Sequence, residues 1–178
     1  MNDSNVPALS LGSLGQLFRH MEWADAMVWT AVLATDPGGP DSRLREDLFH
    51  VHATQRAFLS VWLDEPVDYG NASEFETLPA LRTWAREFYP SAESFRAQVI
   101  EADLVKPVSV PWTHYFSERI GREAAVPMLA DTLYQVVAHT TYHRGQVNRR
   151  IRELGGEPPL VDYIAWIWSG KPEPEWSD

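Results

Sequence analysis

The sequence predicts an all-α fold, a four-helix bundle with a short extra C-terminal helix. Four stretches carry apolar residues at the three- and four-residue spacing of one helical face. Segments rich in Pro, Gly or Asp separate them, and the chain has no strand-rich region, internal repeat or low-complexity tract. Four long amphipathic helices with intervening connections are typical of a helical bundle.

The first two helices are expected on either side of the sequence DPGGP at 36–40. Ser13 and Gln16 form a capping-box pattern, which predicts the start of the first helix. The apolar residues that follow at helical spacing are Leu14, Leu17, Phe18, Met21, Ala24, Met27 and Val28. The second helix is predicted to begin at Asp41 or Ser42 and to end at the DEP tripeptide.

The middle of the chain is less regular. Residues 67–76 have no hydrophobic period and are expected to form a loop. Thr77 predicts the N-cap of a third helix, and Pro90 inside that helix predicts a kink. Residues 103–122 mix prolines and a glycine with many aromatic and β-branched residues, so we expect an ordered connection packed on the bundle, with at most a short strand.

The clearest helix is predicted at about 126–154, where Gly155 and Gly156 provide a C-terminal stop. A short apolar helix is expected at 161–168, with Asp162 as its cap because a negative charge suits the helix N-terminus. The eight tryptophans are expected in the core and in dimer contacts.

The composition is that of one globular domain, and we expect residues 1–178 to form it. The 25 acidic and 15 basic side chains give a net charge of −10, which would repel a phosphate backbone, so we expect no nucleic-acid partner. No stretch approaches the length of a membrane span, and the first ten residues lack a secretion signal. We therefore expect a soluble, cytoplasmic protein with no membrane partner.

The chain contains no cysteine, which excludes disulfides, thiolate metal sites and cysteine nucleophiles. Any metal ion must be held by imidazole, carboxylate, carbonyl or water.

His139 and His143 are the residues that most directly suggest chemistry. Four positions apart on a helix, they offer ring nitrogens to one point in space. They also lie beside an apolar stripe, where an unpartnered imidazole would be desolvated at a cost. This spacing is metal-chelating, although two packing histidines can share it by chance.

A stable centre needs a third protein ligand, and the second helix offers His50 and His52. They are two residues apart and point to different sides of the helix, so at most one of them can be the ligand, and periodicity does not decide which. The histidine that is not the ligand is expected on a helix flank without a chemical role. His20 is expected to be a hydrogen-bonded core or rim residue. His114 belongs either to a surface loop or to a site entrance.

Two known classes of metal site are excluded. The sequence HTTYH at 139–143 has threonine where the H-E-x-x-H zinc proteases carry their glutamate base. Di-iron bundles require several inward glutamates with Glu-x-x-His spacing, and this chain has no such pair. A mononuclear site with three nitrogen ligands and open water positions remains.

The stretch HTTYHRGQVNRRIRELGGEPPLVDYIAW resembles the DinB/YfiT-like family, whose signature is H-x-x-x-H-R-G-Q followed by a Gly-rich turn, a proline pair and an aspartate. The segment HVHATQRAFLSVWL is similar to the family's earlier motif in the register that selects His50 and leaves out His52. The opening HMEWADAMV resembles the first helix, with Asp25 where asparagine is common. Gln55 stands where relatives often carry glutamate.

The resemblance implies a bundle of up-down-down-up topology in which His50, His139 and His143 bind one divalent metal ion, most often zinc or nickel. It implies a homodimer. Some relatives join a low-molecular-weight thiol, such as bacillithiol or mycothiol, to an electrophile, which suggests a small-molecule substrate and a metal-dependent thiol S-transferase. The alternatives are a metal-dependent hydrolase and a non-enzymatic metal-binding stress-response protein.

A metal ion held by three neutral imidazoles keeps its full charge, so it lowers the pKa of a bound thiol or water. The sequence does not separate these two reactions. Arg144 is interpreted either as a salt bridge to a neighbouring helix or as a clamp for a substrate carboxylate. Gln146 is expected either to be structural or to form a hydrogen bond near the site.

Overall fold

The computed structural model describes residues 9–36 and 41–176. Its helices are α1 (Leu11–Thr35), α2 (Ser42–Trp62), α3 (Leu78–Arg86), α4 (Phe88–Gln98), α5 (Thr113–Ile120), α6 (Leu129–Glu153) and α7 (Tyr163–Trp168), with 3₁₀ turns η1 (Ala72–Glu74) and η2 (Glu101–Asp103). Apart from one isolated β-bridge between Pro107 and Met128, the regular structure of these residues is entirely helical. The all-α prediction is confirmed.

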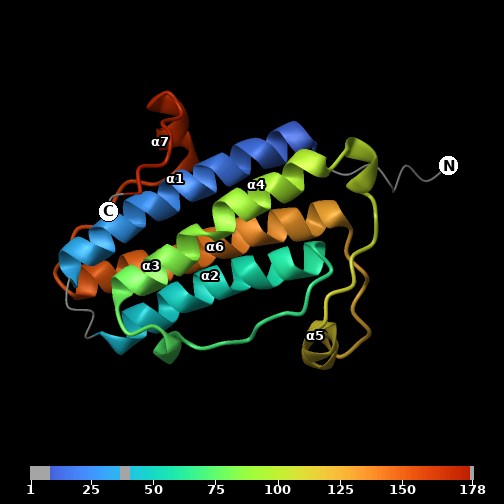
Figure 1. The fold of residues 1–178 in the computed structure, drawn as a ribbon, viewed down its shortest axis with the longest axis horizontal. Helices are drawn as coiled ribbons and strands as arrows, with labels where there is room; N and C mark the ends of the chain where they lie inside the picture. The colour runs from blue at the N-terminus through green and yellow to red at the C-terminus, as the bar shows by residue number, and fades with distance from the viewer. Residues whose placement is uncertain (1–8, 37–40, 177–178) are drawn as a thin grey trace.

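The long helices lie side by side, as Figure 1 shows. Helix α6 packs against both α1 and α2, while α3 and α4 pack against α2. Helix α5 lies apart from this group, near the end where α2 finishes and α6 begins (Figure 1). None of the helices within the described ranges combines the length and the apolar character needed to cross a lipid bilayer.

The helix ends follow local sequence signals, with one correction. Helix α1 begins earlier than the Ser13 pattern predicted, because the Ser10 side chain caps it by accepting a hydrogen bond from the Ser13 backbone N–H. Asp41 caps α2 and Thr77 caps α3, as predicted. The expected break at 37–40 lies outside the described residues.

The third predicted helix is interrupted, in agreement with the kink expected from Pro90. Helix α3 ends at Arg86, four residues before Pro90, and α4 begins at Phe88. A proline lacks the N–H that would bond to the carbonyl four residues back, and its ring clashes with that carbonyl. The interruption between α3 and α4 therefore lies at the position expected from Pro90.

Helix α6 begins at Leu129, slightly later than predicted, where the Asp131 carboxylate accepts a hydrogen bond from the Met128 N–H at 2.8 Å. The helix ends as expected, since Gly155 adopts a φ of 85° and the Gly156 N–H donates to the carbonyl of Ile151 at 2.9 Å. Asp162 stands at the N-cap of α7, but its side chain makes no capping hydrogen bond.

The core has two large apolar halves with polar side chains between them. One half surrounds Phe18, Phe58 and Leu133, and the other surrounds Trp29, Leu48 and Ile151. The buried polar residues between the two halves are Asp25 on α1, His52 and Gln55 on α2, and Thr140 and Arg144 on α6. Burying polar groups is costly without partners, so these residues mark the level of the bundle where a site is to be sought.

Candidate metal centre

Two histidines of α6 and one of α2 meet where these helices pack together. His139 and His143 share a face of α6, and their ring centroids are 4.2 Å apart. The ring of His50 approaches from α2, with its centroid 4.4 Å from that of His143 and 5.0 Å from that of His139. One potential ligand atom from each residue lies within 4.8 Å of the others. The three histidines singled out from the sequence and the resemblance therefore form a cluster.

The donor set fits one divalent metal ion of borderline softness, such as zinc or nickel. Three imidazoles provide nitrogen ligands, which both metals accept. The Nδ1 atom of His139 is buried and has no hydrogen-bond partner among the described residues. A buried, unpartnered polar atom is destabilising, so the cluster favours an ion that would engage its nitrogens.

The electrostatics keep two of these rings in the ligand form. Burial, followed by repulsion from His143 and His50, lowers the pKa of His139 to about 4. Burial and His143 also lower the pKa of His50, against the opposing effect of Asp47. Both rings are neutral at pH 7, the state in which a ring nitrogen offers a lone pair to a metal.

Gln146 fixes the tautomer of His143. The Nδ1 atom of His143 lies 2.8 Å from Oε1 of Gln146. Because an amide oxygen can only accept, Nδ1 carries the hydrogen and donates it, which leaves the Nε2 lone pair for a ligand bond. Gln146 therefore forms the hydrogen bond near the site that was one of its two expected roles.

Asp47 adds a carboxylate one helical turn before His50. Burial raises its pKa, and the nearby Arg43 and His143 act against this rise. Asp47 was not among the residues singled out from the sequence. The three-residue spacing between Asp47 and His50 was the available signal, because residues at that spacing are neighbours on a helix surface.

A buried polar network lies directly beside the cluster. Asp25 accepts a hydrogen bond from Nε of Arg144 at 2.9 Å and forms an ion pair with its Nη2 at 2.8 Å, and both side chains are 4% exposed. The Gln55 amide donates to Asp25 at 3.0 Å and to Thr140 at 3.1 Å. Tyr89 donates its hydroxyl hydrogen to the same carboxylate. The network joins α1, α2, α4 and α6 at the level of the histidines.

His52 completes this network, and it lies buried in the interior instead of on the helix flank where it was expected. Its side chain is buried; Nε2 accepts from Trp29 Nε1 at 2.9 Å and Nδ1 donates to Gln55 Oε1 at 2.8 Å. Burial lowers the pKa of His52, so the ring stays neutral. Its role is structural, since both ring nitrogens are already engaged.

The remaining residues singled out from the sequence are not members of the cluster. Arg144 is the salt bridge between helices that was one of its two interpretations. His20 is buried, with Nε2 2.9 Å from the carbonyl oxygen of Val161, as expected of a hydrogen-bonded core residue. His114 lies exposed on α5, 3.3 Å from the carbonyl oxygen of Pro111.

The model of the DinB family matches residues 1–176 of this chain. The chain belongs to the DinB family. No curated protein sequence matches it.

Two positions at which the resemblance implied another residue are in contact in this structure. Position 25 has aspartate where the resemblance gives asparagine, and position 55 has glutamine where it gives glutamate. These two side chains are hydrogen-bonded to each other at 3.0 Å. In this pair the Gln55 amide is the hydrogen-bond donor and the Asp25 carboxyl group is the acceptor.

Proposed function

We propose that this DinB protein binds one divalent metal ion, zinc or nickel, through His50, His139 and His143, and that the centre transfers a low-molecular-weight thiol to an electrophile. One observation carries the proposal: three imidazoles each present a nitrogen atom, and these nitrogens lie within 4.8 Å of one another. The thiol follows from the family resemblance.

When bound, such an ion would supply Lewis acidity that lowers the pKa of a thiol or of water. The surroundings of the cluster suit a reacting small molecule. His50 is exposed, so this side of the cluster opens to solvent, while His139 and His143 are half-buried. Asp47 lies on the same face of α2 as His50 and is half-buried, and its raised pKa makes it a better proton acceptor than an ordinary surface carboxylate.

A purely structural metal is less well supported. The ligands come from α2 and α6, which are already joined by the buried hydrogen bond between Gln55 and Thr140 and by apolar side chains on both sides of it. A metal that staples helices is most needed where such contacts are lacking. Removal of the ion should therefore abolish turnover and leave a folded helical protein.

Four features of the fold and setting belong to the same proposal. We infer a four-helix bundle of up-down-down-up topology, supported by the colour gradients of α1, α2, α3–α4 and α6 in Figure 1. We also infer a single domain, because α1 contributes residues to all three apolar clusters. A homodimer and a cytoplasmic location stay predictions.

Elemental analysis of the purified protein tests the ligand set. Wild-type protein should contain about one zinc or nickel ion per chain, and His139→Ala should lose it. His114→Ala is the matched control, since it removes an exposed imidazole outside the cluster. Equal metal content in wild type and His139→Ala would contradict the assignment.

A second measurement tests the reaction. Metal-loaded protein is incubated with bacillithiol or mycothiol and a panel of electrophiles, and loss of free thiol is followed against the chelated protein. Metal-dependent thiol consumption supports S-transfer. Ester or amide cleavage without thiol loss would identify a hydrolase instead. If neither activity is found, the non-enzymatic metal-binding protein is the remaining alternative.

A further inference from the structure

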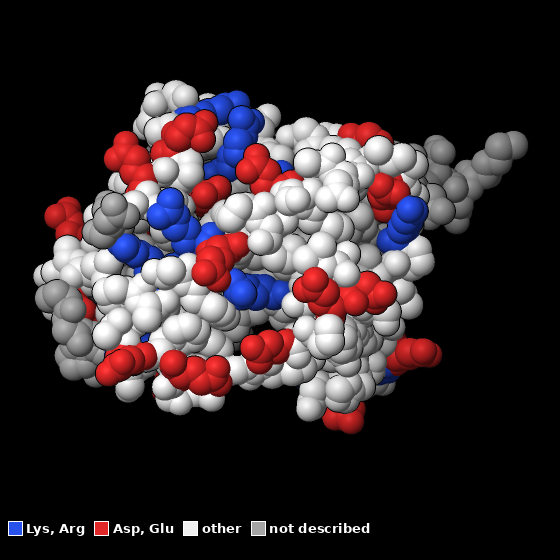
Figure 2. All heavy atoms as spheres, viewed as in Figure 1, with Lys and Arg blue, Asp and Glu red and all other residues white. Residues whose placement is uncertain are grey.

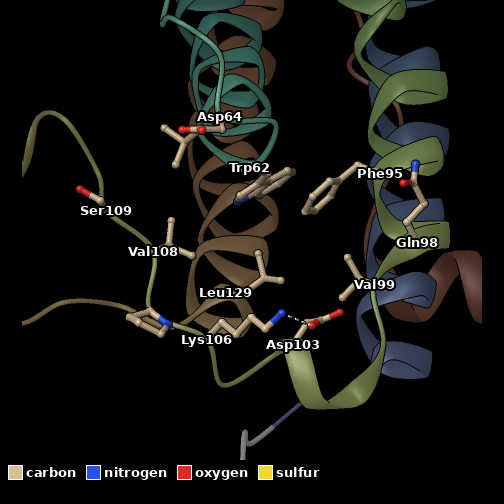
Figure 3. A pocket seen from close by; sticks show the side chains of 12 residues that line it. Trp62, Asp64, Phe95, Gln98, Val99, Asp103, Lys106, Val108, Ser109 and Leu129 are labelled. Atoms are coloured by element: carbon tan, nitrogen blue, oxygen red, sulfur yellow. Dashed lines mark ion pairs between the residues drawn. The ribbon is translucent and has the colours of Figure 1, made fainter.

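A separate cavity, whose lining Figure 3 shows, lies at the end of the molecule where α2 finishes and α6 begins. Its volume is about 450 Å³, within the range of small-molecule sites. Trp62 in its lining lies twelve residues beyond His50 on α2, which corresponds to about 18 Å along a helix. The cavity shares no lining residue with the histidine cluster.

Aromatic and aliphatic side chains form the middle of this cavity. The rings of Trp62 and Phe95 stack at a centroid distance of 5.5 Å and an angle of 15°. Trp62 donates its indole N–H inward, to Oγ1 of Thr132 at 3.0 Å, which fixes the ring and satisfies its polar atom. Both rings are only half-buried, so the protein leaves aromatic surface exposed on this lining.

The opposite wall is held in place by backbone hydrogen bonds. The Leu129 N–H donates to the carbonyl of Lys106 at 2.9 Å, and the Val108 N–H donates to the carbonyl of Pro127 at 2.9 Å. These bonds tie the segment at 106–109 to the start of α6. A wall fixed in this way loses little conformational freedom when a ligand binds.

The charged groups at the rim leave one carboxylate without a partner. Lys106 is paired with Asp103 at 2.7 Å, and Asp103 also accepts from the Ile100 N–H at 2.9 Å. Among the described residues, no hydrogen bond or ion pair joins the Asp64 side chain to another group. Figure 3 shows Asp64 at one side of the aromatic pair and the ion pair of Asp103 and Lys106 at the other.

We propose that this cavity binds a small organic cation, an aromatic amine or aryl quaternary ammonium compound. Its flat apolar body would lie against Trp62 and Phe95, and its positive charge would face Asp64, with additional attraction from the indole ring. An organic anion is disfavoured because Lys106 is already neutralised. The net charge of −10 also favours a cation, and acidic side chains are spread over the face in Figure 2.

The selectivity of the full-length protein tests this proposal. Benzyltrimethylammonium is titrated into the protein by calorimetry, with 3-phenylpropionate as an anion of similar size. The cation should bind about tenfold more tightly than the anion, and less tightly as salt is added. Equal affinities for the two probes would overturn the proposal.

Variants locate the binding. Asp64→Asn removes the charge, and asparagine tolerates the left-handed backbone at this position, where φ is 55°; cation affinity should fall about threefold. Val108→Trp fills the cavity and should abolish measurable binding, with circular dichroism confirming that the variant is folded. Glu118→Gln is the matched control, since it removes one exposed charge on α5. If Asp64→Asn or Val108→Trp bound the cation like Glu118→Gln, the assignment would be wrong.

Discussion

Gln146 controls the histidine cluster at the scale of a single residue, because its amide oxygen accepts the Nδ1 hydrogen of His143. Gln146→Ala should weaken metal binding by about tenfold to a hundredfold, the range typical of lost partners behind a metal ligand. Competition with a chromogenic chelator measures the affinity. Gln146→Glu keeps an acceptor and should stay near wild type. An unchanged affinity of Gln146→Ala would show that the tautomer of His143 is set by something else.

The sequence could predict part of this site but not all of it. The spacing of His139 and His143 predicted that the two rings share a helix face, because residues four apart lie on the same side of a helix. Periodicity could not choose between His50 and His52, since both flank the apolar stripe of α2. The choice depends on the hydrogen bond between Trp29 and His52, a tertiary contact between two helices that local spacing does not reveal.

At the scale of elements, two glycines are expected to respond in opposite ways to the same substitution. A Cβ at Gly156 would lie 2.0 Å from Oγ1 and 2.8 Å from Cβ of Thr35, where the segment after α6 meets the end of α1. Gly156→Ala should therefore destabilise the protein by about 1–3 kcal/mol. A Cβ at Gly145, inside α6, meets nothing within 4 Å. Gly145→Ala should stabilise it by about 0.5–1 kcal/mol.

Urea unfolding followed by circular dichroism, with chelator present, measures both effects. The two variants serve as controls for each other, because each adds one methyl group. Free energies of unfolding that change in the same direction would contradict the close contact with Thr35.

Helices α2 and α6 were predictable because they carry long apolar stripes with recognisable ends. Helix α5 was missed: residues 103–122 were expected to form an ordered connection packed on the bundle, with at most a short strand. The described α5 has no buried residue and no side-chain N-cap, so neither an apolar stripe nor a cap marked it in the sequence. The β-bridge at Pro107 is all that corresponds to the expected strand.

At the scale of the whole molecule, buried histidines make stability depend on pH. Burial lowers the pKa of His20, His52 and His139, in the last case to about 4. The unfolded chain therefore takes up protons near pH 6.5 that the folded protein does not. The contribution of these neutral histidines to stability is fully present above about pH 6.5 and is lost as the pH falls toward their pKa values in the folded protein. Asp25, Arg56 and Arg144 also act on His52, but burial is the largest effect.

The free energy of unfolding should be lower at about pH 5.5 than at about pH 7.5, by about 1 kcal/mol after allowance for solvent screening of the half-buried His139. Urea titrations at the two values, in chelator, measure this. Burial raises the pKa values of Glu22 and Asp47, so these carboxyl groups favour the folded state at low pH, opposite to the histidines. Their effect falls at a lower pH, where carboxyl groups titrate. Greater stability at the acidic value would contradict the assignment.

Along α6, each cluster histidine is followed directly by a member of the buried network: His139 by Thr140, and His143 by Arg144. Inserting or deleting one residue between these pairs would rotate the rest of the helix by about 100°. Such a change would separate the two imidazoles and would also leave Asp25 buried without its partner Arg144. Insertions and deletions in this helix are therefore compatible with the site only before the first pair or after the second. A designed protein that contains the three imidazoles would also need their buried neighbours.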